Sequence, residues 1–370
     1  MVFLERNVLV IDSTWPINSR TERFYSTLSK KYDVSVCAWN RSGLKGDYSQ
    51  HQYVLESNTS YGNSIKKLMH LPMFLFHIVK VLRMVRPEMV FSSHWDVLIL
   101  SRIAMFLAKS DSKVVYDCLD LPTSRNKIVL YFVRALEKVF CHNISLVILA
   151  SRYFSRFYSG KNKLVFENYP SSLVCNRNGY GSLLEEISKF RSVKKDSVTY
   201  ISWIGVVRYP EILRNILEAI RLSDGRLALL VFGDGPHLQW LFNYTSELGI
   251  SSHVHFFGRY QQADLSHIYD CSDFVWAAYP SKDFNVKYAI SNKYFECSYF
   301  CKPIIISNRT EMAKDNSENN SVIAVDEYDV ADIMKVMSFA EKDVPYNKYE
   351  PDVSWESREH LFLERMESLF

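Results

Sequence analysis

The sequence lacks the cysteine pairs and the uninterrupted apolar runs that define several classes of protein. Its seven cysteines are odd in number, and none forms a Cys-x-x-Cys pair, which argues against a disulfide framework and against a zinc site. The N-terminal stretch carries Glu5 and Arg6 before a short apolar run, which predicts a buried strand and not a signal peptide. The most hydrophobic window, residues 68–85, is interrupted by two histidines, a proline and two basic residues, so we expect it not to span a bilayer.

Glycine is also missing where a dinucleotide-binding protein needs it. Residues 12–24, which follow the first predicted strand, contain no glycine. A phosphate-binding turn between strand and helix requires glycine because the backbone must approach the diphosphate closely. We therefore expect neither NAD nor FAD in the N-terminal half, and no bound cofactor.

Short apolar runs alternate with helical patterns along the whole chain, which is typical of parallel sheets covered on both faces. We predict an α/β fold with two Rossmann-like, doubly wound domains that face a cleft. The predicted domains are residues 1–170 and 198–350, joined by a linker at 171–197 that begins in a stretch rich in Asn, Ser and Gly, and followed by a helix at 351–370. The predicted strands are 7–12, 33–39, 88–92, 113–117 and 145–150 in the first domain, and 198–205, 226–233, 253–258, 273–278, 302–307 and 321–325 in the second.

Charge is distributed unequally between the two halves. Residues 1–180 hold 24 Lys and Arg against 13 Asp and Glu, or +11, and the remainder holds 20 against 28, or −8. Basic and aromatic residues concentrate at 64–86, 125–138 and 151–163. These helices either merely cover a sheet or bind anionic lipid headgroups. No recognised nucleic-acid motif accompanies the charge, so we expect no nucleic-acid partner.

In the second domain, Lys293 and Glu296 lie one turn apart near the start of a helix that begins around Ser291. A phosphate could meet Lys293 and the free backbone amides, while the Glu296 carboxylate could accept hydrogen bonds from a ribose diol. The alternative is an exposed ion pair worth a few tenths of a kcal/mol, on the order of 0.3. Gly233 and Gly235, in "GDGP", mark either a ligand-binding loop or a tight turn alone.

In the first domain, His94, Asp117 and Asp120 follow two predicted strands. Glycosyl transfer needs either a base for the acceptor hydroxyl or a group that stabilises an oxocarbenium-like state. We favour Asp120 as the catalytic carboxylate, supported by His94 or Asp117. The alternative is that the two aspartates cap the next helix and that His94 is structural.

Several of these motifs resemble those of one enzyme family. "YISWIGVVRYPEILRNILEAI", "LLVFGDGP" and "NVKYAISNKYFECSYFCKPIIIS" look like the donor domain of GT-B glycosyltransferases, and the nearest resemblance is to the family-4-like bacterial capsule, O-antigen and exopolysaccharide enzymes. "FSSHWD" and "VVYDCLD" resemble the acceptor domain of that group. The tail is similar to its last helix, which crosses back onto the N-terminal domain.

The resemblance implies that Glu296 holds the ribose of a UDP- or GDP-sugar and that Lys293, next to Asn292, contacts the diphosphate. It also implies that Arg208 is a further phosphate ligand. Many retaining members carry a glutamate eight residues before the ribose-binding one, where this chain has Tyr288, so inversion and retention both stay open. Asp283 or Asn285 could substitute. No Asp-x-Asp triplet occurs, which speaks against a metal-dependent GT-A enzyme, so we expect no metal.

The expected activity is transfer of a sugar to an oligosaccharide or lipid-linked acceptor in bacterial polysaccharide biosynthesis. The protein would be cytoplasmic and peripheral on the inner face of the membrane, which it would contact through its basic N-terminal domain. Two alternatives are a nucleotide-sugar epimerase of the same fold and a catalytically degenerate membrane-associated partner.

Overall fold

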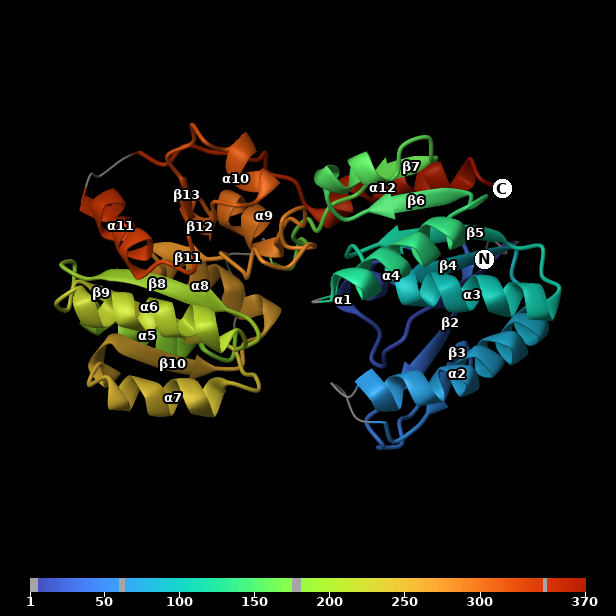
Figure 1. The fold of residues 1–370 in the computed structure, drawn as a ribbon, viewed down its shortest axis with the longest axis horizontal. Coiled ribbons are helices and arrows are strands. Elements are labelled where there is room, and N and C mark those ends of the chain that lie inside the picture. Colours follow the sequence, from blue (N-terminus) through green and yellow to red (C-terminus); the bar gives the residue numbers. More distant parts are fainter. Residues whose placement is uncertain (1–5, 60–63, 125, 175–180, 342–344) are drawn as a thin grey trace. The chain divides into compact units, whose positions relative to one another are not determined.

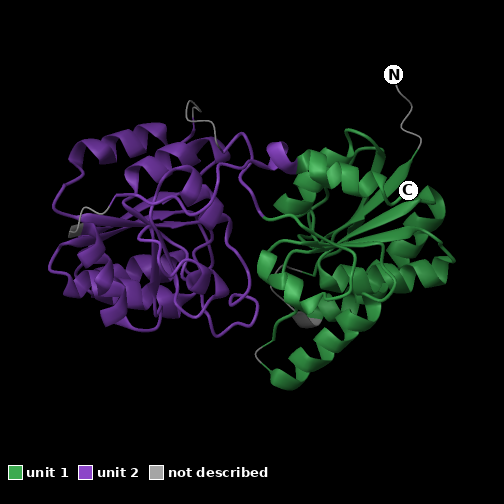
Figure 2. Cartoon of the chain, turned by 90° about the horizontal axis from the view of Figure 1, so that it is seen from above, with its two compact units in different colours: residues 1–167, 359–370 green, residues 168–358 purple. Residues whose placement is uncertain are grey.

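The computed structural model describes all residues except 1–5, 60–63, 125, 175–180 and 342–344. The chain divides into two compact units (Figure 2). Unit 1 comprises residues 1–167 and 359–370, and unit 2 comprises residues 168–358. Each unit is built on its own parallel sheet, which confirms the predicted fold class of two doubly wound domains.

Unit 1 contains a seven-stranded parallel sheet with the strand order β3-β2-β1-β4-β5-β6-β7. Its central strands are buried on both faces, as their almost unbroken apolar sequences require. The strands are β1 (Asn7–Ile11), β2 (Asp33–Asn40), β3 (Gln52–Glu56), β4 (Met89–Ser93), β5 (Lys113–Cys118), β6 (Leu146–Leu149) and β7 (Lys163–Val165).

Helices cover both faces of this sheet (Figure 1). The crossovers from β3 to β4 and from β4 to β5 place α2 and α3 on one face, where α4 also packs against α3. The crossover from β1 to β2 runs in the opposite direction and places α1 on the other face. The helices are α1 (Ser19–Leu28), α2 (Ser64–Val85), α3 (Trp95–Ala108) and α4 (Lys127–Phe140).

The C-terminal residues complete the core of unit 1. Helix α12 (Trp355–Glu367) belongs to unit 1 from Glu359 onward. Phe362 is fully buried, and its ring lies 4.7 Å from that of Phe24 and 6.0 Å from that of Phe166. The tail therefore crosses back to the N-terminal domain, as predicted.

Unit 2 contains a six-stranded parallel sheet with the order β10-β9-β8-β11-β12-β13. Its strands are β8 (Thr199–Ile204), β9 (Leu227–Phe232), β10 (Val254–Gly258), β11 (Phe274–Trp276), β12 (Ile304–Ser307) and β13 (Val322–Val325). Helices α6 and α11 pack together on one face with α7, and α5 packs with α8. The helices are α5 (Leu184–Val193), α6 (Pro210–Leu222), α7 (Leu238–Glu247), α8 (Leu265–Cys271), α9 (Asn292–Tyr299), α10 (Glu311–Asp315) and α11 (Val330–Glu341).

Each strand predicted from the sequence is present within a few residues, but β3 and β7 were not predicted. Both lie at an edge of the unit 1 sheet, and their side chains are half-buried or exposed. A short edge strand needs no apolar run, so hydrophobic periodicity gives no signal for it. The stretch predicted as a linker contains α5, whose Ile187 and Phe190 are buried in unit 2.

Helix α2 differs from expectation. Residues 66–85 form a helix that is long and apolar enough to cross a membrane by length and composition alone, and 28% of that window is buried in the structure. The expectation that the window could not span was therefore wrong by this criterion. Pro72 lies inside the helix and does not end it. The other polar residues that interrupt the apolar window bring few formal charges.

Candidate nucleotide and catalytic sites

In each sheet the strand order reverses at one point, between β8 and β11 in unit 2 and between β1 and β4 in unit 1. Loops that leave the carboxyl ends of such a pair run in opposite directions, and ligands of open parallel sheets bind in the crevice between them. In unit 2 these loops are residues 205–209 and 277–291. The predicted donor-binding residues surround this point.

Gly233 and Gly235 allow the loop after β9 to lie against the loop after β8. Gly233 has φ +140°, and a Cβ atom there would lie 1.9 Å from the carbonyl oxygen of Gly205. A Cβ atom at Gly235 would lie 2.4 Å from the carbonyl oxygen of Val207. Any side chain would force these backbones apart. The close approach leaves a hollow of about 390 Å³, whose lining includes Gly205, Gly233, Gly235 and Tyr260.

Lys293 and Glu296 form a buried ion pair on α9. Ser291 caps the helix by accepting a hydrogen bond from the Lys293 amide, and the Lys293 ammonium lies 2.8 Å from Glu296 Oε2. The Lys293 and Glu296 side chains are only 10% and 9% exposed. The hydroxyl of Tyr269 donates to the same carboxylate oxygen at 2.5 Å. This is not the solvent-exposed surface pair that the sequence left open as an alternative.

The local charges keep the ammonium protonated. Burial lowers the pKa of Lys293, but the negative charge of Glu296, with further contributions from Tyr260 and Tyr279, outweighs it and leaves the pKa raised. Burial likewise raises the pKa of Tyr260, and the charges of Lys293 and Glu296 act on it in opposite directions. Because Tyr260 also lines the hollow, the ion pair and the hollow are neighbours within unit 2.

Other predicted donor residues lie at the same edge but are exposed. Arg208 follows β8, and its guanidinium carbon lies 4.8 Å from the ring centroid of Tyr209. Asn292 is the first residue of α9. Tyr288 is half-buried, and its amide donates to the Asn285 carbonyl.

The loop that carries Tyr288 is anchored by a buried glutamate that sequence reasoning missed. Glu327, fully buried after β13, accepts hydrogen bonds from the amide and hydroxyl of Ser281 at 2.7 and 2.5 Å. The side chain of Asp283 accepts from the Asn285 amide at 2.8 Å. The two residues considered as substitutes for the absent glutamate are thus joined in one local turn.

In unit 1, a hydrogen bond to Asp96 holds the His94 side chain, and the His94 backbone has a positive φ. It follows β4 with φ +68°, and its Nδ1–H donates to Asp96 Oδ1 at 2.9 Å. Lys67 donates to the other Asp96 oxygen at 2.6 Å. Burial lowers the pKa of His94, but the hydrogen bond and charge of Asp96, with Asp120 adding its charge, outweigh it and leave the pKa raised.

Asp120 and Asp117 occupy different environments. Asp120 is half-buried and acts electrostatically on His94, so the structure brings these two predicted residues together. Asp117 is 1% exposed, and both of its carboxylate oxygens accept hydrogen bonds from the Arg20 guanidinium, at 2.9 and 3.0 Å. The Asp117 carboxylate is therefore enclosed within unit 1, where it joins β5 to α1 and also acts electrostatically on His94.

Most missed residues are the partners of predicted ones. Tyr269, Tyr260 and Lys67 lie far from their partners in sequence, so only the folded arrangement identifies them. Asp96 was within reach of the sequence, because it lies two residues after His94 in "FSSHWD". Among the described residues, no group of three or more His, Cys, Asp or Glu is placed to hold a metal ion.

Comparisons with known proteins place this geometry among known architectures. Residues 185–350 match the family described as glycosyl transferases group 1. A search of the curated proteins found no match.

Among solved structures, sucrose-phosphate synthase from Thermosynechococcus elongatus is 12% identical with a TM-score of 0.67, covering 99% of this chain and 95% of that one. Anabaena HepE, solved with UDP and glucose, is 14% identical with a TM-score of 0.67, covering 98% and 99%. A Listeria monocytogenes protein assigned as a UDP-N-acetylglucosamine 2-epimerase is 12% identical with a TM-score of 0.59, covering 98% and 96%. At these identities the structural likeness establishes the fold alone, and proteins described as transferases and as an epimerase both have it.

Proposed function

We propose that the protein is a glycosyltransferase that moves a sugar from a UDP- or GDP-sugar to a lipid-linked bacterial surface glycan. The match of residues 185–350 to the glycosyl transferases group 1 family and the GT-B fold support this proposal. The observation that carries the donor assignment is the buried Lys293–Glu296 pair beside the glycine-lined hollow. A nucleotide diphosphate brings both a diol and a double negative charge, which a carboxylate and an ammonium can bind.

In this proposal the hollow takes the nucleoside, and Glu296 accepts hydrogen bonds from the ribose hydroxyls. Lys293, Arg208 and the amide groups at the start of α9, beside Asn292, neutralise the diphosphate as it leaves. The helix terminus suits this role because its amides have no intrahelical partners. The loops at Gly233 and Gly235 let backbone amides approach the ligand.

The acceptor chemistry is assigned to unit 1. Asp120 acts on the acceptor hydroxyl or on the developing positive charge, and His94 is held for the same step by Asp96. Asp117 is instead a structural partner of Arg20. The excess of basic residues in the N-terminal half supports an anionic acceptor and a peripheral contact with the inner face of the membrane.

Thermal stabilisation of the full-length protein tests the donor assignment. UDP or GDP at about 100 times its Kd should add about 2.7 kcal/mol of stability, which corresponds to roughly 5–10 °C in Tm for a unit of this size. Uridine and guanosine, which lack the diphosphate, should stabilise much less. If none of the nucleotides raised Tm, the donor assignment would be wrong.

Turnover then tests the acceptor assignment. Asp120→Asn should reduce sugar transfer strongly while UDP stabilisation stays intact. Incubation with the donor sugar alone should give at most slow hydrolysis, whereas interconversion of the sugar would indicate an epimerase. Asp120→Asn with full transfer activity would remove Asp120 from the catalytic step.

A further inference from the structure

Helix α4 in unit 1 exposes several of its large apolar side chains. Of its 14 residues, Glu137 is the one that is buried. Ile128 and Tyr131 are each 79% exposed, Phe132 is 61% exposed and Val139 is 66% exposed. A helix that only covered a sheet would bury these residues and expose its glutamate.

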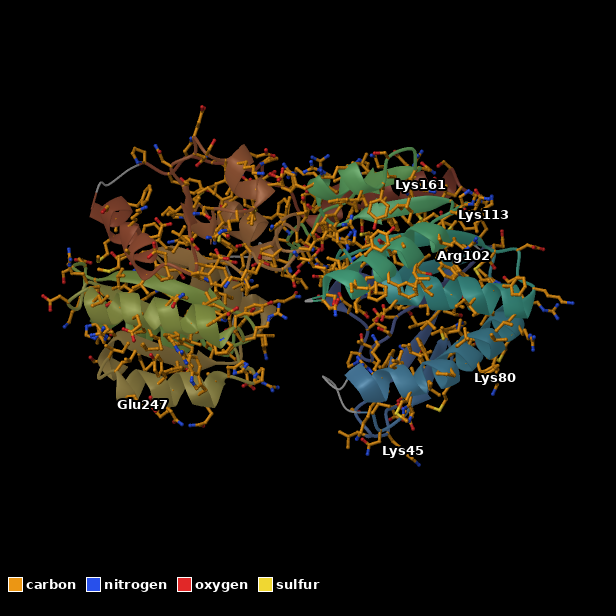
Figure 3. The ribbon with its side chains drawn as sticks, viewed as in Figure 1. Lys45, Lys80, Arg102, Lys113, Lys161 and Glu247 are labelled. Atoms are coloured by element: carbon orange, nitrogen blue, oxygen red, sulfur yellow. The ribbon has the colours of Figure 1, made fainter. Side chains whose placement is uncertain are left out.

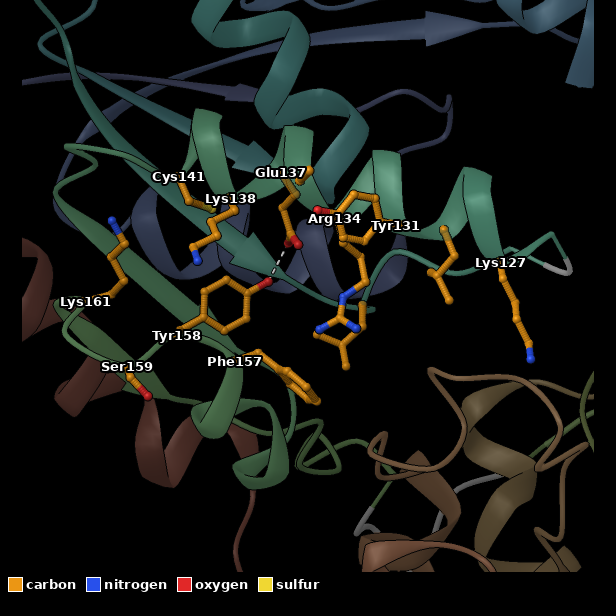
Figure 4. A pocket seen from close by; sticks show the side chains of 13 residues that line it. Lys127, Tyr131, Arg134, Glu137, Lys138, Cys141, Phe157, Tyr158, Ser159 and Lys161 are labelled. Atoms are coloured by element: carbon orange, nitrogen blue, oxygen red, sulfur yellow. Dashed lines mark hydrogen bonds between the residues drawn. The ribbon is translucent and has the colours of Figure 1, made fainter.

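A pocket of about 510 Å³ lies beside this helix, entirely within unit 1 (Figure 4). Leu121, Leu130 and Phe157 give it apolar walls. At its base, Glu137 Oε1 accepts hydrogen bonds from the hydroxyls of Tyr116, at 2.8 Å, and of Tyr158. Ligand pockets of this volume are commonly apolar with a few polar groups that fix orientation.

Cationic groups surround the pocket. Lys127, Arg134, Lys138 and Lys161 all line it. The Arg134 guanidinium carbon lies 5.0 Å from the ring centroid of Phe157. Neither Lys138 nor Lys161 has a partner for its ammonium among the described residues. Lys161, which is labelled in Figure 3, is partly exposed and lies just before β7.

Glu137 offsets only part of this charge, because four cationic side chains line the same pocket. Burial raises the pKa of its carboxyl group, although the tyrosine hydroxyls and Arg134 act in the opposite direction. It is the one acidic side chain that lines the pocket in the described part of the chain. The lining therefore combines apolar walls with a surplus of positive charge.

We propose that this pocket binds the phosphate-bearing end of an anionic membrane lipid, with the phosphate between Lys138, Lys161 and Arg134 and the first carbons of its chain against Leu130 and Phe157. Two observations carry the choice of occupant. The cations match a phosphate, and the exposed apolar residues of α4 beside the pocket match the bilayer from which the lipid chain would come. The inference deepens the proposed function and rests on it for the membrane as the source of the lipid.

Calorimetric titration of the full-length protein tests the ligand class. The probes are decyl phosphate below its micelle concentration, sodium phosphate and decyl maltoside. Decyl phosphate should bind with one equivalent, and the other two at least tenfold more weakly. Equal binding of sodium phosphate would indicate an anion site without a lipid role, equal binding of decyl maltoside would indicate an apolar groove without headgroup selection, and either result would overturn the proposal.

Variants test the place of binding. Lys138→Ser with Lys161→Ser should weaken decyl phosphate binding about 10- to 30-fold, at about tenfold per 1.4 kcal/mol. Lys189→Ser with Lys195→Ser, which removes the same charge from exposed positions in unit 2, should leave it unchanged. Ala135→Trp, at an exposed lining position, should weaken binding at least tenfold without changing the charge.

The membrane source is tested with vesicles. Flotation with phosphatidylglycerol vesicles should recover the protein, and phosphatidylcholine vesicles or the double lysine variant should recover much less. Equal recovery in all cases, or a stable dimer in sedimentation velocity that Phe132→Asp dissociates, would overturn the proposal. Retained UDP stabilisation shows that each variant is folded and that the donor site is intact. If the wild-type protein is stabilised by UDP or GDP but does not bind decyl phosphate, this inference alone is rejected. If it binds decyl phosphate but is stabilised by neither nucleotide, the proposed donor site alone is rejected.

Discussion

The buried pair on α9 gives the most decisive prediction. Glu296→Gln keeps the shape of the side chain and removes its charge, so the Lys293 ammonium loses its partner at 2.8 Å. Both side chains are about nine-tenths buried, so water cannot replace the lost partner. Removing one member of a buried ion pair typically costs about 3–5 kcal/mol. In a unit of this size, that loss corresponds to roughly 6–20 °C in Tm.

Differential scanning calorimetry of the full-length protein measures this cost. Glu311→Gln is the matched control, because Glu311 pairs with Lys314 at the same helical spacing but the Lys314 side chain is 65% exposed. The control should cost less than about 1 kcal/mol. Lys293→Met combined with Glu296→Gln should recover much of the loss, since no unpaired charge then stays buried.

The pH dependence of this loss has a defined sign. The pKa of Lys293 is raised in the folded protein, so the stability that the pair contributes is fully present below the unfolded value of about 10.4 and is lost as pH rises through the folded value. The gap between wild type and Glu296→Gln should therefore be constant near pH 7 and close in strong alkali. If Glu296→Gln cost no more than Glu311→Gln at pH 7, the pair would not be the buried element that we describe.

Three further predictions follow from the same structure. Gly233→Ala should destabilise unit 2 and abolish UDP stabilisation, because the new Cβ atom would lie 1.9 Å from a backbone carbonyl oxygen. Gly249 also has a positive φ, but a Cβ atom there would meet no atom within 4 Å. Gly249→Ala should therefore cost only about 1 kcal/mol in calorimetry. Asp96→Asn should lower the pKa of His94, measured by NMR titration. Because that pKa is raised in the folded protein, the contribution of protonated His94 to stability is present below about pH 6.5 and is lost as pH rises. An unchanged pKa of His94 in the variant would contradict the geometry. Asp120→Asn should lower kcat far more than it changes the KM for the donor, in a donor-consumption assay.

The sequence predicted the sheets well because buried parallel strands are apolar runs of distinctive length. It failed at β3 and β7, since an edge strand that packs on one side needs no such run. Helix α2 was judged by its interruptions, although the proline and the histidines within it leave its length and overall apolar composition intact.

The candidate site was predictable only where one short stretch carries the chemistry. Lys293 and Glu296 are one helical turn apart, so their pairing follows from helix geometry. Tyr269, whose hydroxyl donates to the Glu296 carboxylate, lies on another helix 27 residues away. No local sequence pattern connects Tyr269 with Glu296. Asp117 was predicted as a support for Asp120, but its buried ion pair with Arg20, 97 residues away in sequence, could not be predicted from the local sequence.

The position of Phe362 affects the order in which the two units can fold during synthesis. Its ring fills the centre of an aromatic cluster whose other members, Phe24, Phe91 and Phe166, leave the ribosome long before it. The residues of unit 2 are contiguous and can close on themselves as soon as they emerge. The residues of unit 1 that are made first therefore complete their core only after Phe362 has been translated.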